Sequence, residues 1–155
     1  KRLFYNTPGE STIVFAGRDG LMKRLEVVER IAQDNPHHLK IFISLHFDHA
    51  PWYISGARLF TTQSQAHHPF LQLLAHSFRE ARLGLTIRSL DQQMINSHNQ
   101  LFVLVHGAIT PRMLIELGNF NDERDRSLML NARGREQYAH IIIDALQKFL
   151  RKQND

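Results

Sequence analysis

The chain has 155 residues, of which 43% are hydrophobic and 22% charged, a composition that suits one globular domain with a core of ordinary size. Its net charge of +4 suits polyanionic surroundings, but its Lys and Arg residues are scattered, so we expect no nucleic-acid interface. Cysteine is absent, which excludes disulfides and thiolate metal sites, and no apolar run approaches the roughly 20 residues of a membrane span. Any metal ion must therefore be held by His, Asp or Glu.

The first third of the chain is predicted to hold a strand, a helix and a second strand. Residues 11–16 are apolar and β-branched, which predicts a short strand. Apolar residues then recur at helical spacing up to the Asn35-Pro36 breaker, at Leu21, Leu25, Val28 and Ala32. The apolar run over residues 40–45 predicts a strand that is buried on both faces.

The remainder alternates in the same way. We predict an edge strand over residues 57–61, a helix marked by Leu71, Leu74, Ala75 and Phe78, and a long polar loop over residues 88–100. Two apolar strands follow, over residues 101–105 and 113–117. A final helix carries Tyr138, Ile142, Ala145, Leu146 and Phe149 on one face. The pattern predicts an α/β fold: a single domain with a largely parallel sheet flanked by helices.

His46 and Glu116 are the ionisable residues that follow the two most apolar strands. In open α/β sheets, ligands collect at the carboxyl ends of strands, so both side chains are candidates for one site. A histidine can bind Zn²⁺ and a partly desolvated glutamate can handle the protons of a water molecule. The alternative is structural: a histidine with a satisfied hydrogen bond, and a carboxylate paired with an arginine.

A set of motifs in fixed order, from about Val14 to Leu150, carries a resemblance to a known family. The motifs are Arg18-Asp19, Arg30-Ile31-Ala32, Phe42-Ile43-Ser44-Leu45-His46, Ser55-Gly56, Arg88 with Asn96 or Asn99, and Pro111 followed by Glu116-Leu117-Gly118-Asn119-Phe120-Asn121-Asp122. Each is weak alone, but six elements with compatible spacing are a strong signal together. In these motifs the chain resembles the zinc-dependent N-acetylmuramoyl-L-alanine amidases of the amidase_3 type, which cut bacterial peptidoglycan. Asp125 and the C-terminal helix also fit.

The resemblance implies one amidase catalytic domain over residues 1–155, related in fold to zinc exopeptidases and lacking the family's N-terminal strand and helix. His46 matches a zinc-binding histidine. Glu116 matches the catalytic glutamate that takes a proton from the zinc-bound water and passes it to the leaving amine. Arg88, Asn99 and His49 are predicted to contact the substrate. The bond cut would be the amide between N-acetylmuramic acid and L-alanine of the stem peptide.

The resemblance further implies Zn²⁺ as cofactor, peptidoglycan as substrate, a regulatory protein as partner and a periplasmic or secreted location. The family's two other zinc ligands, a histidine in an upstream turn and a glutamate on the first helix, have no recognisable counterpart in this sequence. A catalytic zinc normally needs three protein ligands. Two alternatives therefore stay open: an amidase-like module that binds peptidoglycan or a partner protein without hydrolysis, and a different zinc peptidase or hydrolase on a similar sheet.

Overall fold

The computed structural model describes residues 18–49, 51, 54–83, 85–90 and 101–154. The predicted strand over residues 11–16 therefore lies outside the described residues. In chain order the elements are α1 (Arg18–Asp34), β1 (Phe42–Asp48), β2 (Ala57–Thr62), η2 (Gln63–Gln65), α2 (Pro69–Glu80), β3 (Leu85–Leu90), α4 (Phe102–His106), β4 (Arg112–Asn119), α5 (Glu123–Leu130) and α6 (Ala132–Asn154). No helix in these ranges is long and apolar enough to cross a bilayer.

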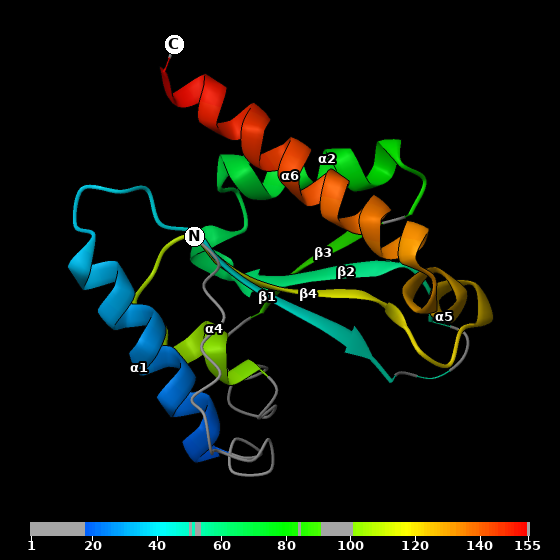
Figure 1. Cartoon of the computed structure of the whole chain (residues 1–155), viewed down its shortest axis with the longest axis horizontal. Helices are drawn as coiled ribbons and strands as arrows, with labels where there is room; N and C mark the ends of the chain where they lie inside the picture. Colours follow the sequence, from blue (N-terminus) through cyan, green and yellow to red (C-terminus); the bar gives the residue numbers. More distant parts are fainter. Residues whose placement is uncertain (1–17, 50, 52–53, 84, 91–100, 155) are drawn as a thin grey trace.

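A four-stranded sheet forms the middle layer, in the order β1-β4-β2-β3 (Figure 1). β1 runs parallel to β4, β2 runs parallel to β3, and β2 and β4 are antiparallel. The sheet is therefore mixed, with the parallel pairs at its two sides. The predicted single α/β domain with a largely parallel sheet flanked by helices is confirmed, with the antiparallel pairing of β2 with β4 as the exception.

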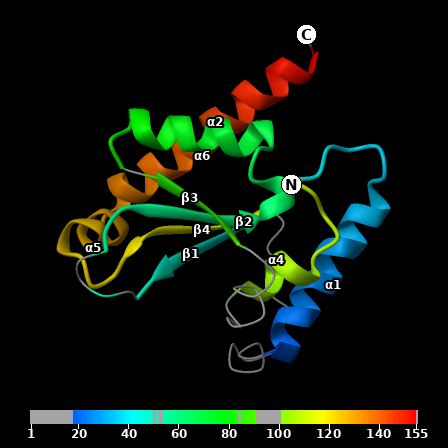
Figure 2. The ribbon, with the colours of Figure 1, turned by 180° about the vertical axis from the view of Figure 1, so that it is seen from behind.

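Helices cover the two faces of the sheet unequally, as both views of the ribbon show (Figures 1 and 2). On one face α2 and α6 lie side by side and build the larger core, in which Leu59, Phe78 and Ile115 are fully buried. On the other face α1 and α4 form a smaller core, in which Leu25 and Leu114 are buried. Successive strand residues point to opposite faces, so β1, β2 and β4 each contribute side chains to both cores.

Most of the predicted elements are confirmed. The helix predicted to end before Asn35 is α1, the strand predicted over residues 40–45 is β1, and the strand predicted over residues 113–117 is β4. The two helices predicted from apolar spacing are α2 and α6. In α6, Tyr138, Ala145 and Phe149 are buried as expected.

Residues 57–61 were expected to form an edge strand, but β2 is an inner strand between β4 and β3. Its inner position arises because β3 pairs with β2 on the side away from β4. Its alternate residues Ala57, Leu59 and Thr61 are 2%, 0% and 0% exposed. The loop predicted over residues 88–100 is wrong at its start, since Arg88 lies in β3, the strand that pairs with β2. Residues 91–100 lie outside the described residues.

The strand predicted over residues 101–105 is wrong, because this segment forms helix α4. Five apolar residues suit either element, and a run this short carries too little periodicity to decide. As a helix it buries Leu101 and Leu104 against α1 and the sheet. It also satisfies backbone hydrogen bonds within itself and needs no neighbouring strand.

Candidate functional site

His46 and Glu116 lie opposite each other on neighbouring strands. They are Cα partners in the parallel pairing of β1 with β4. The sequence predicts His46 just beyond the end of a strand. In the structure β1 continues to Asp48, so His46 lies inside the strand. Both side chains belong to the face of the sheet that α1 and α4 cover, because Leu114, two residues before Glu116, is part of that core. The structure thus brings the two predicted site residues together.

Glu116 is a buried carboxyl group. The residue is 8% exposed, and its Oε2 atom is buried with no hydrogen-bond partner among the described residues. Burial raises the pKa of Glu116, and the positive charge of Arg58 opposes that rise in part. A buried carboxyl group with a raised pKa and an oxygen that makes no hydrogen bond is a better proton acceptor than an ordinary exposed carboxylate.

His46 is exposed, and its Nε2 atom lies 2.9 Å from Oγ of Ser44 on the same strand. Loss of solvent around the ring, and then the charge of Arg24 on α1, lower the pKa of His46. The lowered pKa favours the neutral form of the ring. A neutral imidazole is the form that binds a metal ion or accepts a proton.

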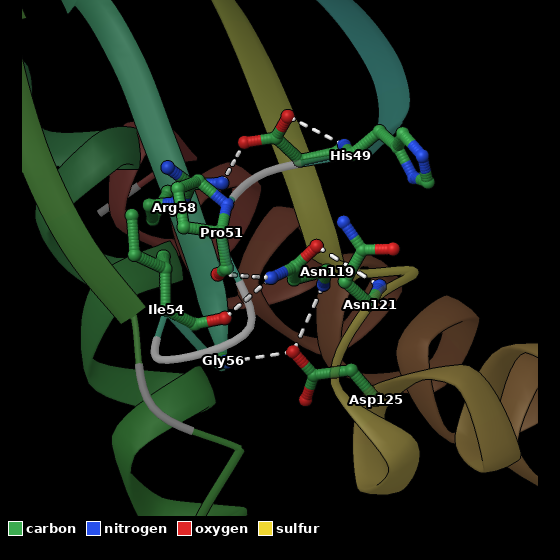
Figure 3. A network of polar contacts seen from close by, with 9 residues as sticks. His49, Pro51, Ile54, Gly56, Arg58, Asn119, Asn121 and Asp125 are labelled. Carbon is green, nitrogen blue, oxygen red and sulfur yellow. Dashed lines mark hydrogen bonds and ion pairs between the residues drawn. The ribbon is translucent and has the colours of Figure 1, made fainter.

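An ion pair that the sequence did not indicate crosses this face. Arg58 on β2 donates from Nη2 to Oδ2 of Asp48 on β1 (Figure 3). The other oxygen of Asp48 accepts a hydrogen bond of 2.6 Å from the backbone N–H of His49. Because β4 lies between β1 and β2, the pair spans the strand that carries Glu116.

A second polar network anchors the chain between β1 and β2 to the end of β4 (Figure 3). Asn119 is fully buried, and its Nδ2 donates to the carbonyl oxygens of Pro51, at 2.9 Å, and Ile54, at 2.7 Å. Asp125 is 4% exposed, and its Oδ2 accepts from the backbone N–H groups of Gly56, at 2.8 Å, and Asn119, at 2.9 Å. The network fixes the segment that follows His46 against the segment that follows Glu116.

The three predicted substrate contacts fare differently. His49 is exposed, with its ring 6.4 Å from the ring of Phe120, and in Figure 3 it points away from the Asn119 network. Arg88 lies on β3 opposite Phe60 of β2, so β2 separates it from Glu116. Asn99 lies outside the described residues. The structure therefore places His49 and Arg88 but leaves their predicted roles as predictions.

The described residues include two candidate ligands for a metal ion, His46 and Glu116. His46 offers an imidazole ring, and Glu116 offers a carboxyl oxygen that has no hydrogen-bond partner among the described residues. Within the described ranges there is no group of three His, Asp or Glu residues that could hold a metal ion. The described residues alone thus fall short of the three protein ligands of a catalytic zinc.

Arg58, Asp48 and Asn119 were missed as site residues. Arg58 carried one usable signal, a charge inside the alternating strand Ala57-Arg58-Leu59-Phe60, but nothing in the sequence says which strand lies beside it. Asp48 and Asn119 stand at the ends of β1 and β4, where polar residues are common. Their partners come from distant parts of the chain, so only the fold reveals them.

A buried glutamate opposite a histidine on a parallel neighbouring strand supplies groups that proton transfer and metal-assisted hydrolysis both use. A family model described as N-acetylmuramoyl-L-alanine amidase (Amidase_3) matches residues 9–148. This match covers most of the 155 residues, so the chain belongs to that family. The resemblance found in the sequence motifs is confirmed. A search of curated proteins gave no match.

Solved amidase structures share the fold. The CwlD amidase from Clostridioides difficile, solved with the GerS lipoprotein, matches 97% of this chain and 71% of its own, with 18% identity and a TM-score of 0.63. Ami1 from Mycobacterium smegmatis matches 81% of this chain and 61% of its own, with 23% identity and a TM-score of 0.60. The catalytic domain of CwlV from Bacillus (Paenibacillus) polymyxa var. colistinus matches 84% and 65%, with 16% identity and a TM-score of 0.61. The chain thus spans less than two thirds of the Ami1 and CwlV chains.

Proposed function

We propose that the chain hydrolyses the amide bond between N-acetylmuramic acid and L-alanine of peptidoglycan, with Glu116 as its proton-transfer residue. Family membership supports the class of reaction. The observation that carries the proposal is the placement of Glu116: buried, with one oxygen unpaired among the described residues, and opposite His46 on the parallel strand.

In this reaction the oxygen of a water molecule attacks the amide carbonyl carbon while the water gives up a proton. Glu116 accepts that proton, since burial raises its pKa. The carbon–nitrogen bond then breaks, and Glu116 returns the proton to the leaving amine of L-alanine. The products are the free carboxylate of the muramic acid lactyl group and the free amino terminus of the stem peptide.

The proposal includes Zn²⁺, with His46 as one ligand. A bound zinc polarises a carbonyl group and makes a water molecule more acidic. Because the described residues offer no group of three ligands, the proposal requires further ligands from outside the described ranges. Both proton transfers described above are assigned to Glu116 alone.

Family membership also supports an extracytoplasmic location, where peptidoglycan lies, and we extend the proposal to a periplasmic or secreted protein. One structural relative, CwlD, was solved in complex with the GerS lipoprotein. That complex supports the proposal that this chain also binds a protein partner.

A second candidate function is binding of peptidoglycan or a partner protein without hydrolysis. Two observations favour it. The described residues lack a three-ligand group, and the guanidinium of Arg58 places a positive charge on the same face as Glu116. A resident cation beside the site opposes the binding of a divalent metal ion.

Digestion of purified peptidoglycan, with mass analysis of the products and zinc measured on the same sample, separates these functions. We expect unsubstituted stem peptides with a free L-alanine terminus, together with bound zinc. Glu116→Gln should lower the rate by on the order of 100-fold or more, and His46→Ala should lower both rate and zinc content. Glu26→Gln, on the exposed surface of α1, is the matched control. Peptidoglycan that co-sediments with the protein and stays uncut would instead support the binding module.

A further inference from the structure

Arg58 lies beside Glu116 on the neighbouring strand of the sheet. It lies on β2 as the antiparallel Cα partner of Glu116 on β4, so the two side chains share one face of the sheet. The Arg58 side chain is only 12% exposed, although an arginine on a sheet surface usually reaches solvent. Its charge lies close enough to act on the Glu116 carboxyl.

Arg58 is also tied to the strand on the far side of Glu116. Its guanidinium pairs with Asp48 on β1, whose side chain is 25% exposed. The backbone carbonyl of Asp48 in turn accepts a 2.8 Å hydrogen bond from the N–H of Phe120, just after β4. The arginine therefore links β2 to β1 across β4, at the level of the two predicted site residues.

The geometry of an arginine suits this task. A guanidinium presents five N–H donors in a rigid plane, so it can hold one carboxylate and still present charge to a second. A lysine offers one compact charge on a flexible stem. Deleting Arg58 would leave two partly buried carboxyl groups, Asp48 and Glu116, on one face without that cation.

We propose that Arg58 is a positioning residue for Glu116: its ion pair with Asp48 fixes the guanidinium on the face of the sheet that carries Glu116, and the fixed charge orients the Glu116 carboxylate. The kinetic part of this inference rests on the proposed function, whereas the coupling between the two side chains does not. A purely structural ion pair is the competing explanation. In that case Arg58 would stabilise the sheet without regard to the charge of Glu116.

A double-mutant cycle on thermal unfolding, at one pH with metal chelated, tests the coupling without any activity. Arg58→Gln, Glu116→Gln and the double variant are compared with the wild type. We expect Arg58→Gln to lower the melting temperature by at least about 2 °C more in the wild type than in the Glu116→Gln background. Equal losses in the two backgrounds would overturn the proposal. If Arg58→Gln fails to fold, Arg58→Lys and Asp48→Asn provide the same comparison.

The kinetic arm uses peptidoglycan cleavage by the full chain. Arg58→Gln should lower kcat by roughly 10–100-fold with little change in KM, because loss of a residue that orients a functional group costs about that much. Arg58→Lys should recover part of the loss, and Arg79→Gln, on the exposed surface of α2, should match the wild type. A change confined to KM would contradict positioning. A wild type that cleaves nothing would refute the proposed function, while the thermal cycle still decides the role of Arg58.

Discussion

Asp125 joins three segments through a single carboxylate, which makes its removal an exacting test of the structure. Its Oδ2 accepts from the N–H groups of Gly56 and Asn119, and its own N–H donates to Oδ1 of Asp122 at the start of α5. The residue is 4% exposed, so water cannot readily replace it. Asp125→Ala leaves two N–H groups without their acceptor.

The expected cost follows from these contacts. A hydrogen bond to a charged group contributes about 1.5–3 kcal/mol, so losing two gives a gross loss of roughly 3–6 kcal/mol. The substitution also removes the cost of burying a carboxylate, which offsets part of the lost hydrogen-bond energy. The net destabilisation should be about 2–4 kcal/mol. For a domain of this size the melting temperature should fall by roughly 4–16 °C. Asp125→Asn keeps an oxygen acceptor without the charge, so it should lose about half as much.

Thermal unfolding followed by circular dichroism measures the loss, and hydrogen exchange locates it. The amide hydrogens of Gly56 and Asn119 should lose protection in Asp125→Ala, while that of Ile115, in the middle of β4, should keep it. Glu26→Ala, an exposed acidic position on α1, controls for the loss of a negative charge. An Asp125→Ala melting temperature within about 2 °C of the wild type would refute the reasoning.

Three further predictions follow from the same region. Asn119→Ala removes the donor to the Pro51 and Ile54 carbonyls, so proteolysis between β1 and β2 should accelerate; an unchanged digestion rate would contradict the network. Gly118→Ala should cost about 1–3 kcal/mol in chemical denaturation, because its Cβ would lie 2.9 Å from Cβ of Asp125 and 3.0 Å from Cε2 of Phe47; a neutral substitution would show that this packing is looser. Burial raises the pKa of Glu116, so the folded state binds its proton more tightly than the unfolded state, and stability falls as pH rises from the ordinary carboxyl pKa through the raised one. With metal chelated, the stability of Glu116→Gln relative to wild type should therefore increase with pH over that range, and a constant difference would argue against a raised pKa.

The sequence predicted the elements whose apolar pattern is long or unambiguous. α1, α2 and α6 carry several turns of regular spacing, and β4 contains the apolar run Met113-Leu114-Ile115. The predictions were wrong where the apolar pattern is short or where a neighbouring strand determines the position of an element in the sheet. The five residues of α4 suit a helix or a strand, and the inner position of β2 depends on pairing with β3, which no local property of residues 57–61 reveals.

Helix α5 was also missed, although a signal was present. Asp122 caps this helix by accepting the N–H of Asp125, and the spacing of three between an Asp and another acidic residue is typical of a helix start. The helix has a weak apolar pattern, so periodicity alone could not find it. Capping chemistry would have located it.

For the site, the sequence indicated His46 and Glu116 because each is an ionisable residue that follows an apolar run. The parallel pairing of β1 with β4 then places them opposite each other. Arg58 could not be assigned to the same place, since its link to Asp48 depends on strand order and on the antiparallel direction of β2. Contacts between residues far apart in the chain are a property of the topology, not of any local pattern.

The unequal cores on the two faces of the sheet have a consequence for how the molecule opens. Local unfolding starts where the least apolar surface is buried, so the layer of α1 and α4 should separate from the sheet at a lower free energy than α2 and α6. Glu116 lies on β4, an inner strand whose opposite face packs against the larger core. The sheet with α2 and α6 should therefore stay folded, and Glu116 should keep its place on β4, while the layer of α1 and α4 opens.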